Sequence, residues 1–66
     1  MDTNEMFGRV NENGDVAVLW KEDGEPVTRM DANVYPVDSD LSARYEHPEG
    51  IVLEISDAKS IGLEIE

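Results

Sequence analysis

The chain contains no cysteine, so neither a disulfide nor a thiolate-bound metal can brace its fold. Its 66 residues suffice for one small domain, and such a domain buries only about 60% of the surface that its unfolded chain exposes. Hydrophobic residues make up 39% of the chain, and their clustering and alternation argue against disorder. We therefore expect a single acidic β domain over residues 1–66, with modest stability.

Basic residues are also scarce. Five Lys and Arg stand against sixteen Asp and Glu, which gives a formal net charge of -11. Because phosphate binding needs a basic surface, this balance excludes nucleic acid as a direct ligand. It excludes anionic membrane surfaces for the same reason. A basic protein is the expected kind of partner.

Long apolar runs are missing. No stretch approaches the roughly 20 apolar residues of a membrane helix. The first residues, Met1–Glu5, are acidic and polar, whereas a secretory signal begins basic and turns apolar. We expect a cytoplasmic protein, located in the host cytoplasm if a phage encodes it.

Groups suited to catalysis are few. His47 is the only histidine, and it precedes Pro48 in an evident turn. The chain has no nucleophile, phosphate-binding or dinucleotide motif. An EF-hand register with Gly14 at the sixth position places Arg9 and Trp20 where oxygen ligands belong, so a calcium loop does not fit. The sequence predicts no enzyme, no metal and no cofactor.

What the chain does have is one run of five uninterrupted apolar residues, Val16–Trp20. A short apolar run rich in β-branched and aromatic residues is typical of a strand buried on both faces. Asn13-Gly14 precedes it and Asp23-Gly24 follows it, and both pairs are strong hairpin signals. We expect a three-stranded meander with this run at its centre.

Three-residue loops with left-handed glycines keep the flanking carboxylates from facing one another directly. This register places Val10 opposite Val16, and Leu19 opposite Val27. One face of the sheet then carries Met6, Val10, Val16, Val18, Trp20 and Met30. The other carries Phe7, Leu19 and Val27, with Arg9, Ala17 and Arg29 in one row across it.

Two further elements are expected downstream. Asp38-Ser39-Asp40 resembles a helix N-cap, and Leu41 and Tyr45 are four residues apart, which predicts a short helix near 40–46. A C-terminal hairpin, pairing Ile55 with Ile61 across the polar connection 56–60, is predicted by the alternation of Ile51, Leu53, Ile55, Ile61, Leu63 and Ile65.

The expected fold is mainly β, with five strands and one short helix. Because both sheet faces carry apolar residues, we expect a small barrel or sandwich of SH3-like or OB-like type. The alternative is an antiparallel sheet with the helix packed on one face. Edge strands over Met6–Val10 and Ile61–Ile65 would allow a homodimer to complete the small core.

The aromatic residues suggest a second kind of site. Phe7, Trp20, Tyr35 and Tyr45 could cage a methylated lysine, as some small barrels do. The place of Trp20 on the central strand favours a role in the core instead.

The carboxylates exceed what solubility requires, since a small domain needs a net charge of magnitude about 2–8. Outward residues two apart on a strand are about 6.6–6.8 Å apart, which is comparable with the phosphate spacing along nucleic acid. We predict a phosphate-like array that binds the partner through Asp38, Asp40, Glu46, Glu49, Glu54, Asp57, Glu64 and Glu66.

In size, acidity and lack of catalytic motifs, the chain is similar to phage-encoded anti-restriction and anti-CRISPR proteins. This profile predicts a non-enzymatic inhibitor that mimics nucleic acid and blocks the basic groove of a DNA- or RNA-binding protein. The alternative is an ordinary acidic β interaction module, from a halophile for example, that binds basic peptides or proteins.

Overall fold

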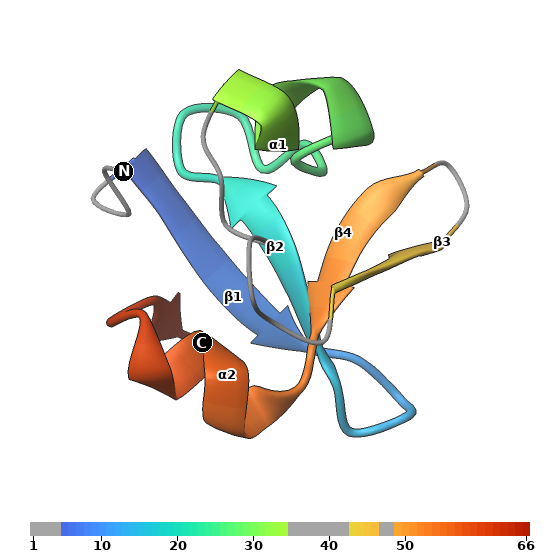
Figure 1. Ribbon diagram of the computed structural model, residues 1–66. Helices are drawn as coiled ribbons and strands as arrows, with labels where there is room; N and C mark the ends of the chain where they lie inside the picture. Colours follow the sequence, from blue (N-terminus) through green and yellow to red (C-terminus); the bar gives the residue numbers. More distant parts are fainter. Residues whose placement is uncertain (1–4, 35–42, 47–48) are drawn as a thin grey trace.

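The computed structural model describes residues 5–34, 43–46 and 49–66 (Figure 1). Five strands form one sheet in the order β3-β4-β2-β1-β5, and two six-residue helices accompany it. The elements, in chain order, are β1 (Met6–Val10), β2 (Val16–Trp20), α1 (Arg29–Val34), β3 (Arg44–Glu46), β4 (Gly50–Leu53), α2 (Ile55–Ser60) and β5 (Glu64–Ile65).

The first hairpin has the predicted register. Val10 lies opposite Val16, and Met6 lies opposite Trp20. The Asn11 amide donates to the Asp15 carbonyl (2.8 Å), and Gly14 has the left-handed φ of 83° that the three-residue loop requires. The Asn11 Oδ1 atom also accepts hydrogen bonds from the amides of Asn13 and Asp15, which fixes the turn locally.

The second turn is one residue longer than predicted. Gly24 is left-handed as expected (φ 74°), but the Trp20 amide donates to the Glu25 carbonyl, so Leu19 lies opposite Pro26 and not Val27. A slip of one residue exchanges the two faces of a strand. Val27 therefore points into the core, where it is fully buried, and not to the opposite face.

The third meander strand ends early. After single bridges at Pro26 and Thr28 the chain enters α1, so Met30 does not face Val16; it is 78% exposed on the helix. Thr28 and Asp31 form a capping box at the start of α1. The Asp31 amide donates to Thr28 Oγ1 (3.3 Å), and Asp31 Oδ2 accepts from the Thr28 amide (3.2 Å). The pattern Thr-x-x-Asp was the sequence signal for this helix.

The helix predicted near 40–46 is wrong over the four residues of it that the structure describes, 43–46, none of which is helical. Arg44–Glu46 is strand β3, which pairs antiparallel with β4, and residues 40–42 lie outside the described part. The half-buried Tyr45 packs against the core from this strand and faces Ile51 across the ladder. The four-residue spacing of Leu41 and Tyr45 therefore does not mark a helical face.

The predicted C-terminal hairpin is also wrong, because Ile55–Ser60 forms α2. The helix buries Ala58 fully, and it places Asp57 in its first turn and Lys59 in its last, as the helix dipole favours. Both edges of β4 are taken by β2 and β3, so a returning strand cannot pair with it. The chain crosses over through α2 and adds β5 parallel to β1.

The result is a mainly β fold built on an open mixed sheet. Among the described residues, β3 and β5 are its edges and do not pair, so closure into a barrel is not confirmed. The edge predicted at Met6–Val10 is wrong, because β1 pairs with both β2 and β5. Of the two predicted arrangements, the sheet with a helix packed on one face is closer to the structure. The observed sheet is mixed and not antiparallel, and its helices lie at 29–34 and 55–60 and not near 40–46.

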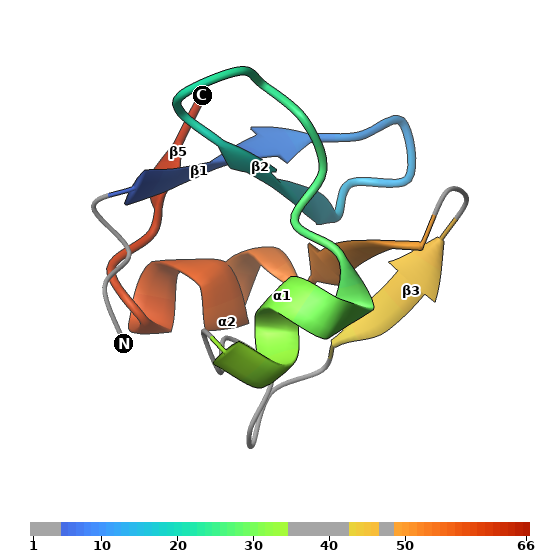
Figure 2. The ribbon, with the colours of Figure 1, turned by 90° about the horizontal axis from the view of Figure 1, so that it is seen from above.

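Both helices lie on the same side of the sheet (Figure 2). We call this side the inner face and the opposite side the outer face. The core lies between the inner face and the helices, and its buried members are Met6, Val16, Val18, Val27, Ile51, Leu53, Ala58 and Leu63. Trp20 is half-buried at the margin of this cluster, which agrees with its predicted core role.

Candidate partner-binding surfaces

The outer face of the sheet carries two cross-strand rows of side chains. The register aligns Arg44, Val52, Ala17 and Arg9 across β3, β4, β2 and β1, and we call these the arginine row. The second row, which we call the glutamate row, consists of Glu46, Pro26, Leu19, Phe7 and Glu64; Gly50 pairs with Glu46, and Pro26 lies against the side of Gly50 where a β-carbon would be. Leu19 and Val52 are buried but do not belong to the inner core cluster.

The arginine row differs from the row that the sequence predicted. Arg9 and Ala17 share it as expected, but Arg44 takes the place assigned to Arg29. Arg29 lies instead in α1, where its guanidinium stacks 4.4 Å from the centroid of the Tyr45 ring. The strand assignment for 25–30 caused this error.

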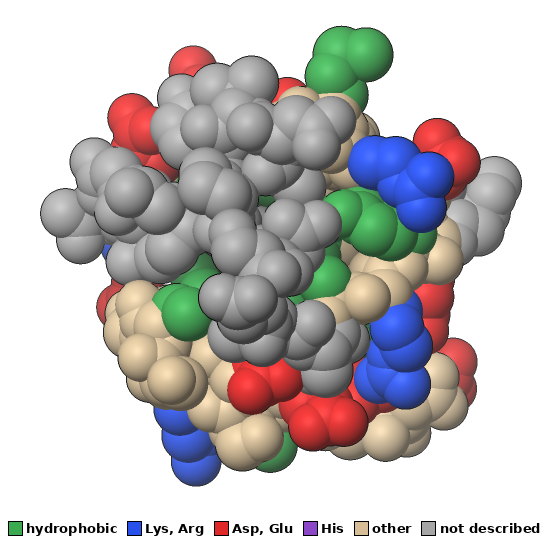
Figure 3. All heavy atoms as spheres, viewed as in Figure 1, with side chains coloured by type: hydrophobic (Ala, Val, Ile, Leu, Met, Phe, Trp, Pro, Cys, Tyr) green, Lys and Arg blue, Asp and Glu red, His purple; other side chains and the backbone are tan. Residues whose placement is uncertain are grey.

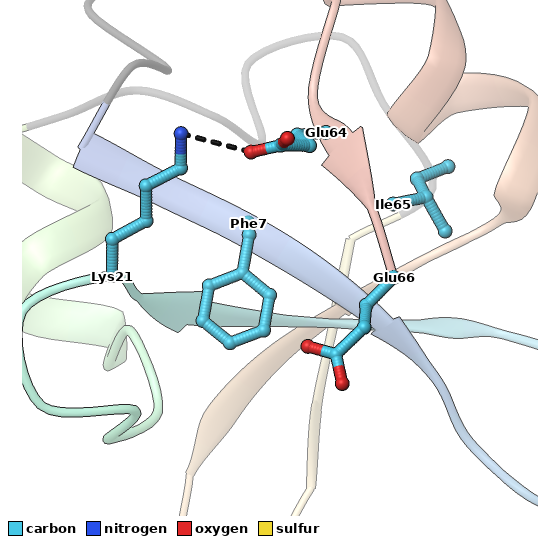
Figure 4. A pocket seen from close by; sticks show the side chains of 5 residues that line it. All are labelled: Phe7, Lys21, Glu64, Ile65 and Glu66. Atoms are coloured by element: carbon cyan, nitrogen blue, oxygen red, sulfur yellow. Dashed lines mark ion pairs between the residues drawn. The ribbon is translucent and has the colours of Figure 1, made fainter.

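The ion pairs of the described residues surround the outer face. Arg9 pairs with Glu66 at 3.5 Å, and Arg44 with Asp15 at 2.5 Å. Lys21 pairs with Glu64 at 2.9 Å across an open depression that the Phe7 ring lines (Figure 4). Five of these six side chains are between 43% and 71% exposed, so each pair contributes at most about 1 kcal/mol to stability. They do, however, cancel most of the charge of this face.

The structure separates the predicted partner-binding carboxylates. Glu46 and Glu49 lie at the β3 edge, whereas Glu64 and Glu66 lie at the β5 edge. Four strand spacings of about 4.8 Å divide the two edges, or about 19 Å. Glu54 and Asp57 belong to a third location at the start of α2, and Asp38 and Asp40 lie outside the described residues. The six of these carboxylates that the structure describes therefore do not form one continuous array.

The helix-bearing face shows the same dispersion. Acidic side chains emerge at its upper left, its right and its lower border (Figure 3). Carboxylates of the described residues therefore lie on this face as well as at the edges of the sheet.

Sequence reasoning missed a group of carboxylates at the end of the sheet where β1 begins and β2 ends. An open depression there is lined by Trp20 and Lys21 together with Glu5, Glu22, Asp23 and Asp31. We call these four carboxylates the acidic end. Asp31 is held in place, since its Oδ2 accepts from Thr28 and, at 3.4 Å, from Trp20 Nε1. In the sequence Glu22-Asp23 indicates only a turn before Gly24, and its proximity to Glu5 and Asp31 depends on the hairpin and α1 together.

The aromatic cage is not assembled by the aromatics that the structure describes. Phe7 is on the outer face, whereas Trp20 and Tyr45 pack against the inner core. Arg9 lies 5.7 Å from the Phe7 centroid, and Arg29 covers Tyr45, so cations of the chain itself already occupy these ring faces. Tyr35 and His47 lie outside the described residues.

Within residues 5–34, 43–46 and 49–66 no group of three or more His, Asp or Glu is arranged to hold a metal ion. No helix in the same ranges is long and apolar enough to cross a membrane. Comparisons with protein-family models, with curated proteins and with solved structures found no match to this chain.

Proposed function

We propose that this protein is a non-enzymatic inhibitor that mimics nucleic acid and occupies the basic groove of a DNA- or RNA-binding protein. The observation that carries the proposal is the surplus of carboxylates over cations on a folded scaffold. Three of the five basic side chains are held in ion pairs with carboxylates of the described residues, and a fourth, Arg29, is stacked on Tyr45. The field that an approaching partner meets is therefore strongly negative.

The acidic end is the part of this surface that best suits a basic groove. Glu5, Glu22 and Asp23 are exposed, and they are held close together by the hairpin turn. By contrast, Glu64 and Glu66 at the β5 edge are each paired with a cation. Electrostatic steering toward the acidic end would speed encounter, and the shape of the groove would supply specificity.

The partner is sought by affinity capture from a bacterial lysate at about 50 mM and about 500 mM NaCl. We expect nucleic-acid-binding proteins to be retained at low salt and released at high salt, because charge pairing at an exposed interface is screened. A competing DNA or RNA duplex should displace them. Captured proteins without nucleic-acid-binding activity, or captured proteins that nucleic acid does not displace, would contradict mimicry.

Two triple variants of equal charge then locate the surface. One carries Glu5→Gln, Glu22→Gln and Asp23→Asn, and the other carries Glu54→Gln, Glu64→Gln and Glu66→Gln. We expect the first to weaken capture at least tenfold more than the second. Equal weakening would mean that net charge alone attracts the partner, and unchanged capture by both would exclude both surfaces.

A further inference from the structure

We infer that the outer face of the sheet is a self-association surface that pairs two copies of this chain face to face. The inference is independent of the proposed inhibition, and it differs from the edge-strand pairing that the sequence suggested. It begins from the one-sided cover of the sheet, since both helices lie on the inner side (Figure 2).

The outer face carries apolar side chains that neither helix covers. Leu19 and Val52 are 8% and 4% exposed, although neither belongs to the core between the sheet and the helices. Around them Phe7, Ala17 and Pro26 are only half-buried. Sheets with two apolar faces commonly pack a second sheet about 10 Å away.

The low net charge of this face favours a second copy of the chain as the partner that packs on it. The described charged side chains on this face and its border are three cations and five carboxylates, a formal charge of -2 in a chain of -11; they are Glu5, Arg9, Asp15, Lys21, Arg44, Glu46, Glu64 and Glu66. A second copy is itself highly acidic, so it is repelled by the other surfaces. The outer face is where two such chains can approach most closely.

The two rows are complementary under two-fold symmetry. When the axis runs perpendicular to the strands and between the rows, the arginine row of one copy faces the glutamate row of the other. Arg44 then meets the partner's Glu46, and Arg9 meets the partner's Phe7. Glu66, which is paired with Arg9 at the β5 end of the same row, meets the partner's Glu64 with the Arg9 guanidinium beside both carboxylates. Each contact occurs twice, because a two-fold interface is isologous.

The size of the molecule limits the strength of the pairing. With principal extents of 25 × 24 × 21 Å, no face exceeds about 600 Å² in projection, whereas a standard interface buries about 800 Å² per partner. We therefore expect a dissociation constant between about 10 µM and about 1 mM. Because both copies carry a charge of -11, association should tighten as salt rises, in contrast to the capture of a basic partner.

Sedimentation equilibrium from about 10 µM to about 1 mM protein, at about 50 mM and about 500 mM NaCl, tests the inference. The wild type should pass from monomer to dimer, and should do so at lower concentration in high salt. Ala17→Glu places a charge at the centre of the face and should weaken association at least tenfold. Met30→Glu adds the same charge on α1, where the side chain is 78% exposed, and should behave as the wild type.

Circular dichroism checks the fold of each variant, and Phe7→Gln replaces Ala17→Glu if the latter does not fold. A wild type that stays monomeric at about 1 mM in high salt overturns the inference. Equal weakening by Ala17→Glu and Met30→Glu also overturns it, since association would then depend on net charge and not on this face.

Discussion

At the scale of single residues, Gly8 shows how closely β1 approaches the rest of the core. A β-carbon at this position would lie 2.3 Å from Val16 Cγ1 and 3.1 Å from Leu63 Cδ2. The first distance is far inside van der Waals contact, so a methyl group cannot be added without moving the Val16 side chain or the strand that carries it.

We therefore expect Gly8→Ala to lower the free energy of unfolding by about 1–3 kcal/mol, measured by urea denaturation. Val16→Ala removes the clashing atom, so the double variant should be less destabilised than the sum of the two single changes, with a coupling of at least about 1 kcal/mol. Strict additivity would show that Gly8 matters for a reason other than this contact.

Glu49 is the one described non-glycine residue with a left-handed backbone, with φ of 74°. This conformation costs a residue with a β-carbon about 1–2 kcal/mol, and a glycine at this position avoids that cost. Glycine loses more conformational entropy on folding than other residues, however, which offsets part of the gain. We expect Glu49→Gly to be more stable than Glu49→Gln by about 0.5–1 kcal/mol in urea denaturation. Both variants lose the same charge, so a gain shared equally by both would be electrostatic and not conformational.

At the scale of elements, the two helices are where reasoning from periodicity failed. Each has six residues, which is too short to display a helical repeat, and the apolar alternation at residues 51–55 resumes at residues 61–65 on the other side of the polar segment 56–60, as in a hairpin. The informative sequence signals lie at the ends of the helices. Thr28 and Asp31 mark the start of α1, and Gly62 follows the end of α2 with φ of 78°.

The capping box of α1 supplies an element-scale prediction. Thr28→Ala removes the hydroxyl that accepts from the Asp31 amide and donates to Asp31 Oδ2, without changing the net charge. We expect a loss of about 1 kcal/mol in the free energy of unfolding. Ser60→Ala, at the exposed end of α2, is the control and should change it by less than about 0.5 kcal/mol. Similar small effects in both would mean that the box does not stabilise α1.

At the scale of the whole molecule, sixteen carboxylates share a body of 25 × 24 × 21 Å. At 0.01 M salt the Debye length is about 30 Å, longer than the molecule, so every carboxylate repels every other. Near 0.15 M it falls to about 8 Å, and only neighbours interact.

We expect the thermal midpoint to rise by about 5 °C between 10 mM and 150 mM NaCl and then to level off, since about 1 kcal/mol shifts a domain of this size by 4–8 °C. Circular dichroism during heating measures it. A chain that is unfolded until salt reaches about 1 M would indicate that the acidity is an adaptation to saline solvent and would count against mimicry.

The sequence by itself determined the hairpin of β1 and β2 together with the charge of the molecule. The register of that hairpin follows from contacts close along the chain: the Asn11 side chain closes the turn, Gly14 accepts the left-handed conformation, and Val16–Trp20 supplies the buried strand. Such contacts can be inferred from local patterns, because they do not depend on where the rest of the chain goes.

Only the tertiary structure decided the partners of the remaining strands and hence the position of each carboxylate. A single extra residue in the turn at Lys21–Gly24 moved Val27 from the outer face into the core. Because β2 and β3 occupy both edges of β4, β5 pairs with β1 at the other side of the sheet. This pairing places Glu64 and Glu66 four strand spacings, or about 19 Å, from Glu46. These outcomes depend on which edges and cavities the earlier elements leave available, and alternation along the chain carries no such information.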